Sequence, residues 1–246
     1  MEKIDISKAP PEYRQIQGIV SILPIGYGVS FIICYGAVLY QAFKDRSYGM
    51  SMMTICCNFA WELVYAFVHR SKDSTRQIVF VVWALLQAII LYSAIKFSPN
   101  EWKHAPLVQQ NILLIYTLCF LGFFSWHLAL AAYLGPLGGY FWGGYVCQAV
   151  MSVGSLSQLI TRGSTRGASS TIWLGRFSGS LFTLAISVVH INYWPEVWGW
   201  MDNPLMRWLA VAFLLLDVTY GICFRRIYQR ERTLEYAKNH ERLKHT

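Results

Sequence analysis

The sequence has few charged residues: 14% of its 246 residues are Asp, Glu, Lys or Arg, whereas 55% are hydrophobic. A chain with so little charge is too apolar for an ordinary soluble domain. It also lacks the apolar–polar alternation of β-strands, because its apolar runs are continuous, and an open sheet edge cannot satisfy its hydrogen bonds in lipid. The composition therefore predicts an all-α integral membrane protein.

Several motifs of known protein classes are also missing. The six cysteines form no C-x-x-C pair, so neither a disulfide framework nor a zinc site is indicated. D-D-x-x-D and D-x-D-D sequences are absent, which argues against a magnesium cluster that ionises diphosphates. H-E-x-x-H and G-x-S-x-G are absent too, which argues against metalloproteases and serine hydrolases. The last apolar run contains no lysine, which removes the Schiff base of an opsin.

What the chain does contain is a series of apolar runs, each close to the roughly 20 residues that a helix needs to cross a bilayer. They approximate to residues 18–43, 49–69, 77–97, 110–133, 138–161, 170–192 and 205–226. The connections are too short for a second domain, so we predict a single bundle of seven transmembrane helices for residues 1–246. The first run is too long for the apolar part of a signal peptide.

Positive charge is unevenly distributed between the two ends of these predicted helices. More Lys and Arg residues fall on the side that carries the C-terminus, including those of a basic tail at 227–246. The positive-inside rule then places the C-terminus in the cytosol and the N-terminus in the lumen or outside. The tail could form an amphipathic helix on the cytosolic leaflet or remain solvated. The net charge of +8 is assigned to topology and lipid headgroups, with no nucleic acid as a partner.

Two carboxylic acids, Glu62 and Asp217, lie deep in the second and seventh runs. An acid at this depth costs about 2.5 to 3.5 kcal/mol on insertion scales, so we take these two as candidates for a reactive centre. At about 1.5 Å per residue their depths agree within about two helical turns, which would let both face one cavity. A dry environment favours the uncharged acid, so at least one is expected to be protonated at neutral pH and able to donate a proton.

Helical spacing supplies polar neighbours for both acids. Asn58 and Tyr65 share a face with Glu62, and Tyr220 shares a face with Asp217. Three interpretations remain open. The acids could catalyse a reaction, they could couple a small transporter to protons, or they could join helices by hydrogen bonds, with Asp217 pairing to Arg176. A scaffold or receptor bundle without chemistry would tolerate amide replacement of both acids without loss of function.

Other intramembrane residues allow both a functional and a structural interpretation. His127 is more typical of a core histidine than of a metal ligand, because no second histidine lies at metal spacing. Arg176 could extend toward the headgroups or anchor a polar substrate or an acid. Among 10 Trp, 15 Tyr and 14 Phe, rings such as those of Trp61 and Trp173 could stabilise a carbocation or could simply pack.

A set of sequence blocks is spread over nearly the whole chain. The blocks are APPEY at 9–13, YGM at 48–50 with CCNFAWE at 56–62, FSPNEWKHAPLV from Phe97, HLALAA from His127, STRGAS from Ser164, WLGRFSGS from Trp173, YWPE from Tyr193 and DVTYGICF from Asp217. They resemble the small, seven-helix, membrane-bound terpene cyclases of fungal meroterpenoid and indole-diterpene (paspaline-type) pathways. Several blocks are most similar to the indole-diterpene branch.

The resemblance implies a metal-independent cyclase of the endoplasmic reticulum, with no redox cofactor and with an isomerase- or lyase-type reaction. Its substrate would be an epoxidised prenyl chain, in the indole branch epoxygeranylgeranyl indole, and an acid would protonate the epoxide before the alkenes attack in sequence. The two essential acids of the family fall on Glu62 and Asp217. The residues expected to bind substrate are Asn58, Trp61, Tyr65, His127, Trp173, Arg176 and Tyr220. Membrane lipid is the other expected partner, and the oligomeric state is left open.

Overall fold

The computed structural model describes residues 5–244, and this part of the chain is helical without any β-strand. The longer elements are α2 (Gln17–Asp45), α3 (Met52–Leu63), the π-helical turn η2 (Val64–Val68), α4 (Ser74–Glu101), α6 (Ile112–Arg162), α7 (Ser170–Tyr193) and α9 (Pro204–Lys244). The shorter elements are η1 (Ile6–Lys8), α1 (Pro11–Gln15), α5 (Pro106–Gln110), α8 (Pro195–Trp198) and η3 (Gly199–Met201). The predicted all-α class is confirmed.

Five helices are long and apolar enough to cross a membrane: α2, α4, α6, α7 and α9. A further apolar helix, Met52–Val68, is shorter. Side chains cap the starts of α3, α4 and α7, among other elements. Ser51 accepts from the backbone N–H of Thr54 before α3, and Asp73 and Ser169 act in the same way before α4 and α7. Such caps satisfy backbone donors that a helix leaves free, so they define where these elements begin.

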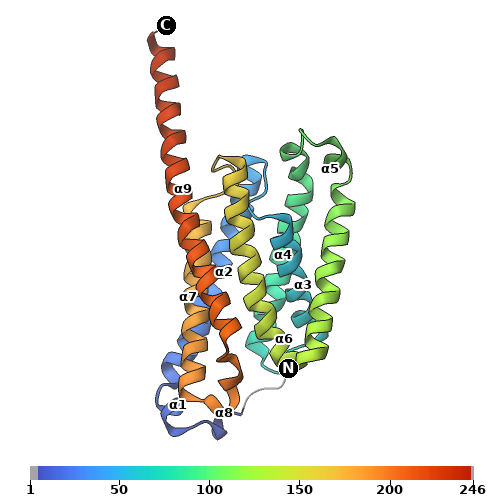
Figure 1. Cartoon of the computed structure of the whole chain (residues 1–246), viewed down its shortest axis with the longest axis vertical. Coiled ribbons are helices and arrows are strands. Elements are labelled where there is room, and N and C mark those ends of the chain that lie inside the picture. Colours follow the sequence, from blue (N-terminus) through green and yellow to red (C-terminus); the bar gives the residue numbers. More distant parts are fainter. Residues whose placement is uncertain (1–4, 245–246) are drawn as a thin grey trace.

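Helix α6 is broken in the middle. Gly135 has φ 76° and ψ 161°, a conformation that suits glycine, and Pro136 follows it. The break lies between the predicted runs 110–133 and 138–161. Figure 1 shows that the two arms of α6 run in opposite directions from this point. The two arms approach each other closely at Gly139, which has no side chain. A Cβ atom at this position would lie only 2.7 Å from the Cα atom of Ala131.

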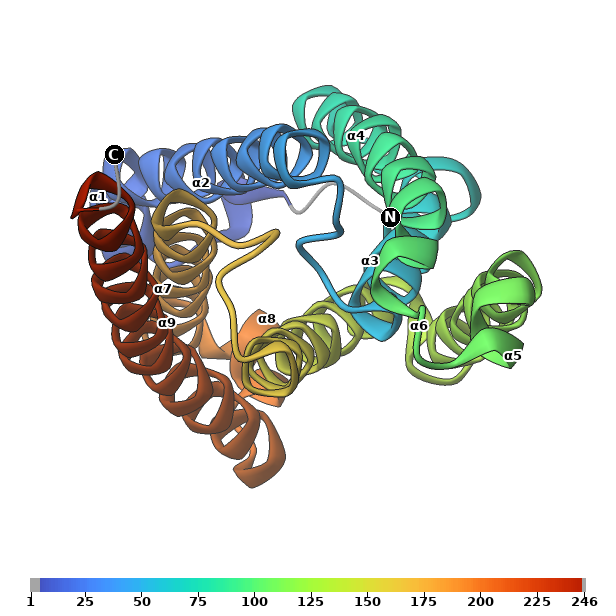
Figure 2. The same ribbon diagram turned by 90° about the horizontal axis from the view of Figure 1, so that it is seen from above.

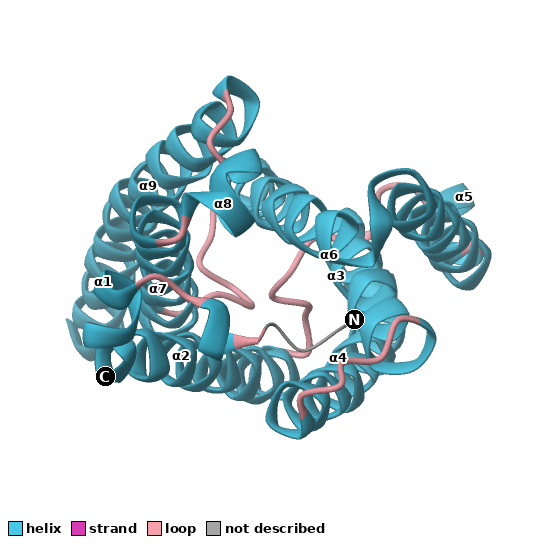
Figure 3. Ribbon diagram, turned by 90° about the horizontal axis from the view of Figure 1, so that it is seen from below, coloured by secondary structure: helices cyan, strands magenta, loops and turns pink. Residues whose placement is uncertain are grey.

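The helices form a ring in which α2 packs along α7, α3 along α6, and α6 along α9 (Figure 2). The connections after α2 and α6 lie at the same end, where Asp45 accepts a hydrogen bond from the backbone N–H of Gly167 at 2.7 Å. Arg162 donates to the backbone oxygen of Tyr48 at 2.9 Å. The short helices α1 and α8 lie at the opposite end (Figure 3). Both ends of the ring are therefore built from segments distant in sequence.

The C-terminal region differs from the prediction. The last helix does not end near residue 226 but continues as α9 to Lys244, and it projects beyond the bundle in Figure 1. As far as residue 244, the basic tail is therefore a continuation of α9 and not a separate helix. Its sequence, rich in Arg, Lys, Glu and Leu, favours helix, and no Gly or Pro interrupts it.

Candidate active site

Glu62 lies near the end of α3 and is 1% exposed. Its Oε1 accepts a hydrogen bond of 2.6 Å from the hydroxyl group of Tyr35 on α2. Its Oε2 is buried and has no hydrogen-bond partner among the described residues. If a carboxyl group held in this way is protonated, the O–H on its other oxygen is available to a bound molecule.

The backbone changes its helical period directly after this acid. Leu63 ends α3, and Val64–Val68 form a π-helical turn that closes with a 2.7 Å bond from His69 N–H to the Val64 carbonyl oxygen. Turns of this type occur frequently at functional sites, because they shift the direction of the side chains that follow. Tyr65 lies within this turn and not in the regular part of α3.

The predicted neighbours of Glu62 do not bind it. Among the described residues, neither Asn58 nor Tyr65 forms a hydrogen bond with the carboxyl group, and the Oδ1 of Asn58 and the hydroxyl of Tyr65 are buried without partners. Trp61 donates instead to the backbone oxygen of Tyr140 at 3.1 Å and stacks on its ring. Trp61 and Tyr65 belong to an aromatic cluster that also contains Phe80, Trp83 and Tyr140.

Asp217 lies on α9 and is fully buried, but its surroundings are ionic. Its Oδ1 lies 2.9 Å from Nη2 of Arg176 on α7, which is 2% exposed. Nη1 of Arg176 donates to Ser155 Oγ at 2.5 Å, and Gln148 donates to Oδ2 of Asp217 at 3.4 Å. Because an arginine cannot be deprotonated in a protein, this pair stabilises a carboxylate. The structure thus contains the Arg176 pairing that sequence reasoning left open.

Aromatic rings enclose this ion pair. The guanidinium group of Arg176 lies 4.8 Å from the centre of the Tyr220 ring. Trp173 Nε1 donates to the backbone oxygen of Asp217 at 2.9 Å, which ties α7 to α9. Tyr220 and Arg176 were predicted as neighbours of Asp217, and the structure places both near it. Trp173 was predicted only to bind substrate or to pack.

Helices α2 and α6 connect the two acids. On α2, Tyr35 donates a hydrogen bond to the carboxyl group of Glu62. The adjacent residue, Cys34, is near enough to the carboxyl group of Asp217 to interact with it electrostatically. On α6, Gln148 donates a hydrogen bond to the carboxyl group of Asp217. The adjacent residue, Cys147, is near enough to the carboxyl group of Glu62 to interact with it electrostatically. The two carboxyl groups form no hydrogen bond with each other. They are separate acids that face the same pair of helices, each with its own partner.

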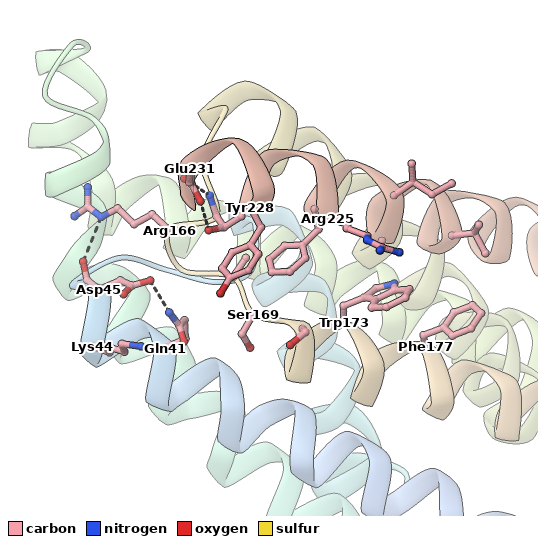
Figure 4. A pocket seen from close by; sticks show the side chains of 17 residues that line it. Gln41, Lys44, Asp45, Arg166, Ser169, Trp173, Phe177, Arg225, Tyr228 and Glu231 are labelled. Carbon is pink, nitrogen blue, oxygen red and sulfur yellow. Dashed lines mark hydrogen bonds between the residues drawn. The ribbon is translucent and has the colours of Figure 1, made fainter. Parts of the chain in front are cut away.

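A cavity of about 1050 Å³ lies beside the second acid, between α2, α7, α9 and the connection after α6 (Figure 4). Its apolar wall includes Trp173, Phe177, Val218 and Ile222, and its rim includes Gln41, Lys44, Asp45, Arg166, Arg225 and Glu231. Neither carboxyl group lines this cavity. Trp173 links the two features, because its ring lines the cavity while its Nε1 binds the backbone of Asp217.

Sequence reasoning missed Tyr35, the one residue that binds Glu62 among those described. Tyr35 and Glu62 are separated by 27 positions and lie on different helices, so no spacing rule within a helix connects them. A polar tyrosine in the middle of the first apolar run was the available signal. Gln148, which contacts Asp217, is not among the predicted site residues either. His127, predicted to bind substrate, lies instead among two cysteines.

The fold and the site together define an all-helical membrane protein with two buried, differently partnered acids. The chain belongs to the family of Pyr4-like transmembrane terpene cyclases, whose model matches residues 4–230. It is 47% identical to terpene cyclase penB of Penicillium crustosum, over 97% of this chain and 98% of that protein. It is also 47% identical to terpene cyclase paxB of Penicillium paxilli, over 95% and 96% of the two chains. Terpene cyclase pyr4 of Aspergillus fumigatus is 40% identical over 95% and 97%.

No solved structure matches the chain. The family membership confirms the resemblance stated from the sequence blocks. The protein is a membrane enzyme that cyclises terpenoids. The transporter alternative finds no support in these relatives, all of which are named terpene cyclases.

Proposed function

We propose that the protein cyclises an epoxidised prenyl chain attached to an indole, epoxygeranylgeranyl indole, in indole-diterpene or meroterpenoid biosynthesis. The observation that carries this proposal is the state of Glu62. It is a buried acid with one oxygen bound by the Tyr35 hydroxyl and the other oxygen free of partners among the described residues. Such a group can deliver a proton to a weakly basic epoxide oxygen in a site that excludes water.

The reaction balances as an isomerisation. The O–H bond of Glu62 breaks as its proton goes to the epoxide oxygen, and the epoxide C–O bond breaks to leave a hydroxyl group and a carbocation. Alkene electron pairs then form the ring C–C bonds in sequence, and loss of a proton from carbon ends the cascade. The Tyr35 hydroxyl stabilises the carboxylate that Glu62 becomes, and the released proton restores the acid.

Asp217 has a different role in this proposal. Paired with Arg176 at 2.9 Å, it is a carboxylate and not a second proton donor. A fixed negative charge in a dry site stabilises positive charge on the prenyl chain as the cation moves along it. The ring faces of Trp61 and Tyr140 near Glu62 and of Trp173 and Tyr220 near Asp217 would contribute in the same sense.

The cavity beside Trp173 is a suitable place for the substrate to enter from the membrane. Val218 and Ile222, which line it, are 44% and 51% exposed on the surface of α9, so lipid-dissolved chains reach it directly. Val218→Trp should fill the cavity and raise KM with little effect on kcat. Leu215→Trp, on the same helix but outside the lining, is the matched control. Equal effects of the two variants would contradict entry at this place.

The deciding experiment uses microsomes that contain the full chain. They are incubated with epoxygeranylgeranyl indole, with epoxyprenyl compounds of other lengths and head groups, and with the alkene that lacks the epoxide, and products are identified by mass spectrometry. We expect a cyclised isomer of the indole epoxide, no product from the alkene, and no product with Glu62→Gln. Turnover of a different epoxide alone would change the substrate, and turnover by Glu62→Gln would remove the proposed acid.

We also propose seven crossings of the endoplasmic reticulum membrane, with a lumenal N-terminus and a cytosolic C-terminus. The two arms of α6 would cross separately, and Met52–Val68 would cross as a short helix with its π turn. The excess of Lys and Arg at the end that carries the tail supports this orientation. An N-glycosylation site inserted before α1 should be glycosylated, and one appended after α9 should not. The reverse pattern would contradict the topology.

A further inference from the structure

Four potential metal ligands meet where α3 packs against both arms of α6. They are the Sγ atoms of Cys57 and Cys147, Nε2 of His127 and the backbone oxygen of Cys57. The two Sγ atoms are 3.5 Å apart, and each lies 3.8 Å from Nε2. The backbone oxygen lies 3.2 Å from Nε2 and 3.7 Å from Cys147 Sγ. Cys57 and His127 are 0% exposed and Cys147 is 4% exposed.

These five distances, between 3.2 and 3.8 Å, are close to the edges of a tetrahedron of four ligand atoms. Its centre, for edges of about 3.6 Å, lies about 2.2 Å from each corner. That value falls between the typical zinc–sulfur distance of about 2.3 Å and the zinc–nitrogen distance of about 2.0 to 2.1 Å. A hydrogen bond between one thiol and the imidazole would explain only one of these short distances. Here three side-chain ligands and a carbonyl oxygen surround one point.

We propose that Cys57, Cys147 and His127 bind a zinc ion, with the Cys57 carbonyl oxygen at the fourth position. Binding would release the two thiol protons, and Nδ1 of His127 would carry the imidazole proton so that the Nε2 lone pair faces the metal. Two thiolates, a neutral imidazole and Zn²⁺ sum to zero charge. A neutral site is the arrangement that a low-dielectric interior tolerates, whereas two thiolates without a metal would be strongly disfavoured.

The sequence does not display such a site because its ligands come from three separate helical segments. Residues 57, 127 and 147 show no short ligand spacing, and the expectation against zinc rested on the lack of a second histidine. The folded chain supplies a second thiolate instead. The site would join α3, which carries Glu62, to both arms of α6, and so would be structural and not catalytic.

The chain offers a matched control. Cys56 is adjacent to Cys57 on α3 and is equally buried, but its sulfur faces the Tyr116 backbone oxygen at 3.6 Å and not His127. Cys56→Ser therefore removes one buried thiol from the same helix without touching the tetrahedron. Cys57→Ser, Cys147→Ser and His127→Gln each remove one ligand.

The test measures bound metal and does not depend on enzyme activity. The full chain is expressed with zinc in the medium, purified in detergent, dialysed, and analysed by inductively coupled plasma mass spectrometry. We expect about one zinc ion per chain in the wild type and in Cys56→Ser, and roughly a tenfold loss in each ligand variant. Replacement of zinc by Co²⁺ should produce a thiolate-to-cobalt charge-transfer absorption in the wild type.

Two results would overturn the inference. One is wild-type protein without zinc that also gains no charge-transfer absorption with Co²⁺. The other is equal metal loss in Cys56→Ser and Cys57→Ser, which would show that any loss follows general disruption of α3. Because the wild-type result stands alone, a ligand variant that fails to fold does not prevent the decision. Zinc binding without epoxide cyclisation, or the reverse, separates this inference from the proposed function.

Discussion

Glu62 and Asp217 are both almost completely buried, on α3 and α9, yet their partners differ in kind. Glu62 accepts from a neutral tyrosine hydroxyl, whereas Asp217 lies beside a guanidinium ion. Burial alone favours a protonated acid in both places, but a neighbouring cation opposes that preference at one of them. The proposed function assigns a neutral acid to Glu62 and a carboxylate to Asp217, and the four predictions below test that division.

The largest effect is expected for Glu62→Gln. The amide keeps the size of the side chain and can still accept from Tyr35, but it has no acidic proton. Positioned general acids contribute about 10²- to 10⁴-fold in rate, so cyclisation should fall by roughly 10³-fold or more. Product formation in microsomes measures the rate, and size-exclusion chromatography in detergent verifies folding. A folded Glu62→Gln enzyme with near wild-type turnover would show that the two acids had been assigned the wrong way round.

Asp217→Asn should damage both activity and stability, because it leaves Arg176 as an unpaired buried charge. Removing one member of such a pair costs about 3 to 5 kcal/mol. We expect a lower Tm in detergent and loss of cyclisation. The double variant Asp217→Asn/Arg176→Gln should recover much of the Tm without recovering activity. If Asp217→Asn melted like the wild type, the aspartate would be neutral and the contrast between the two acids would disappear.

Tyr35→Phe isolates the hydroxyl group that binds Glu62. It should lower kcat by roughly tenfold, since a hydrogen bond to a charged group contributes about 1.5 to 3 kcal/mol and the carboxylate forms during the reaction. KM should change little. Tyr145→Phe is the control, because it removes another buried tyrosine hydroxyl, one that donates to Ser187 at 3.0 Å. A similar fall in kcat for both variants would mean that the effect is one of packing.

The smallest effect is expected at Tyr220, whose ring lies under Arg176. Tyr220→Phe keeps the ring face and should leave the Tm nearly unchanged. Tyr220→Leu removes the cation–π contact, which is worth about 0.5 to 2 kcal/mol, and should lower the Tm modestly. Thermal unfolding of both variants in the same detergent provides the comparison. Equal Tm values for Phe and Leu would show that the ring does not stabilise the guanidinium group.

The sequence predicts the helices well where one physical term dominates. Hydrocarbon thickness sets the length of the apolar runs, so α2, α4 and α7 lie close to the predicted 18–43, 77–97 and 170–192. The end of α9 was missed because hydropathy falls at 226, whereas helix propensity remains high beyond it. Helical turns that are exposed to solvent form from residues of high helix propensity and do not require an apolar run.

The site was only partly predictable for a different reason. Position within an apolar run is a property of a single residue, and it predicts that both acids are buried, as the structure has them. The partners of those acids come from other helices, as Tyr35 does for Glu62, and helix packing decides them. Arg176 was predicted as a possible partner of Asp217 because it is a cation inside a predicted membrane-spanning run. The neighbours counted along α3, Asn58 and Tyr65, proved not to bind Glu62.

Helix α9 carries Asp217 at one part of its length and emerges from the bundle as an unbroken rod. From residue 217 to residue 244 it extends about 40 Å at 1.5 Å per residue, so a tilt of about 5° at the acid moves the far end by about 3.5 Å. A tilt of α9 at Asp217 would therefore be amplified at its far end, where a spectroscopic label on the exposed part of the helix could measure it.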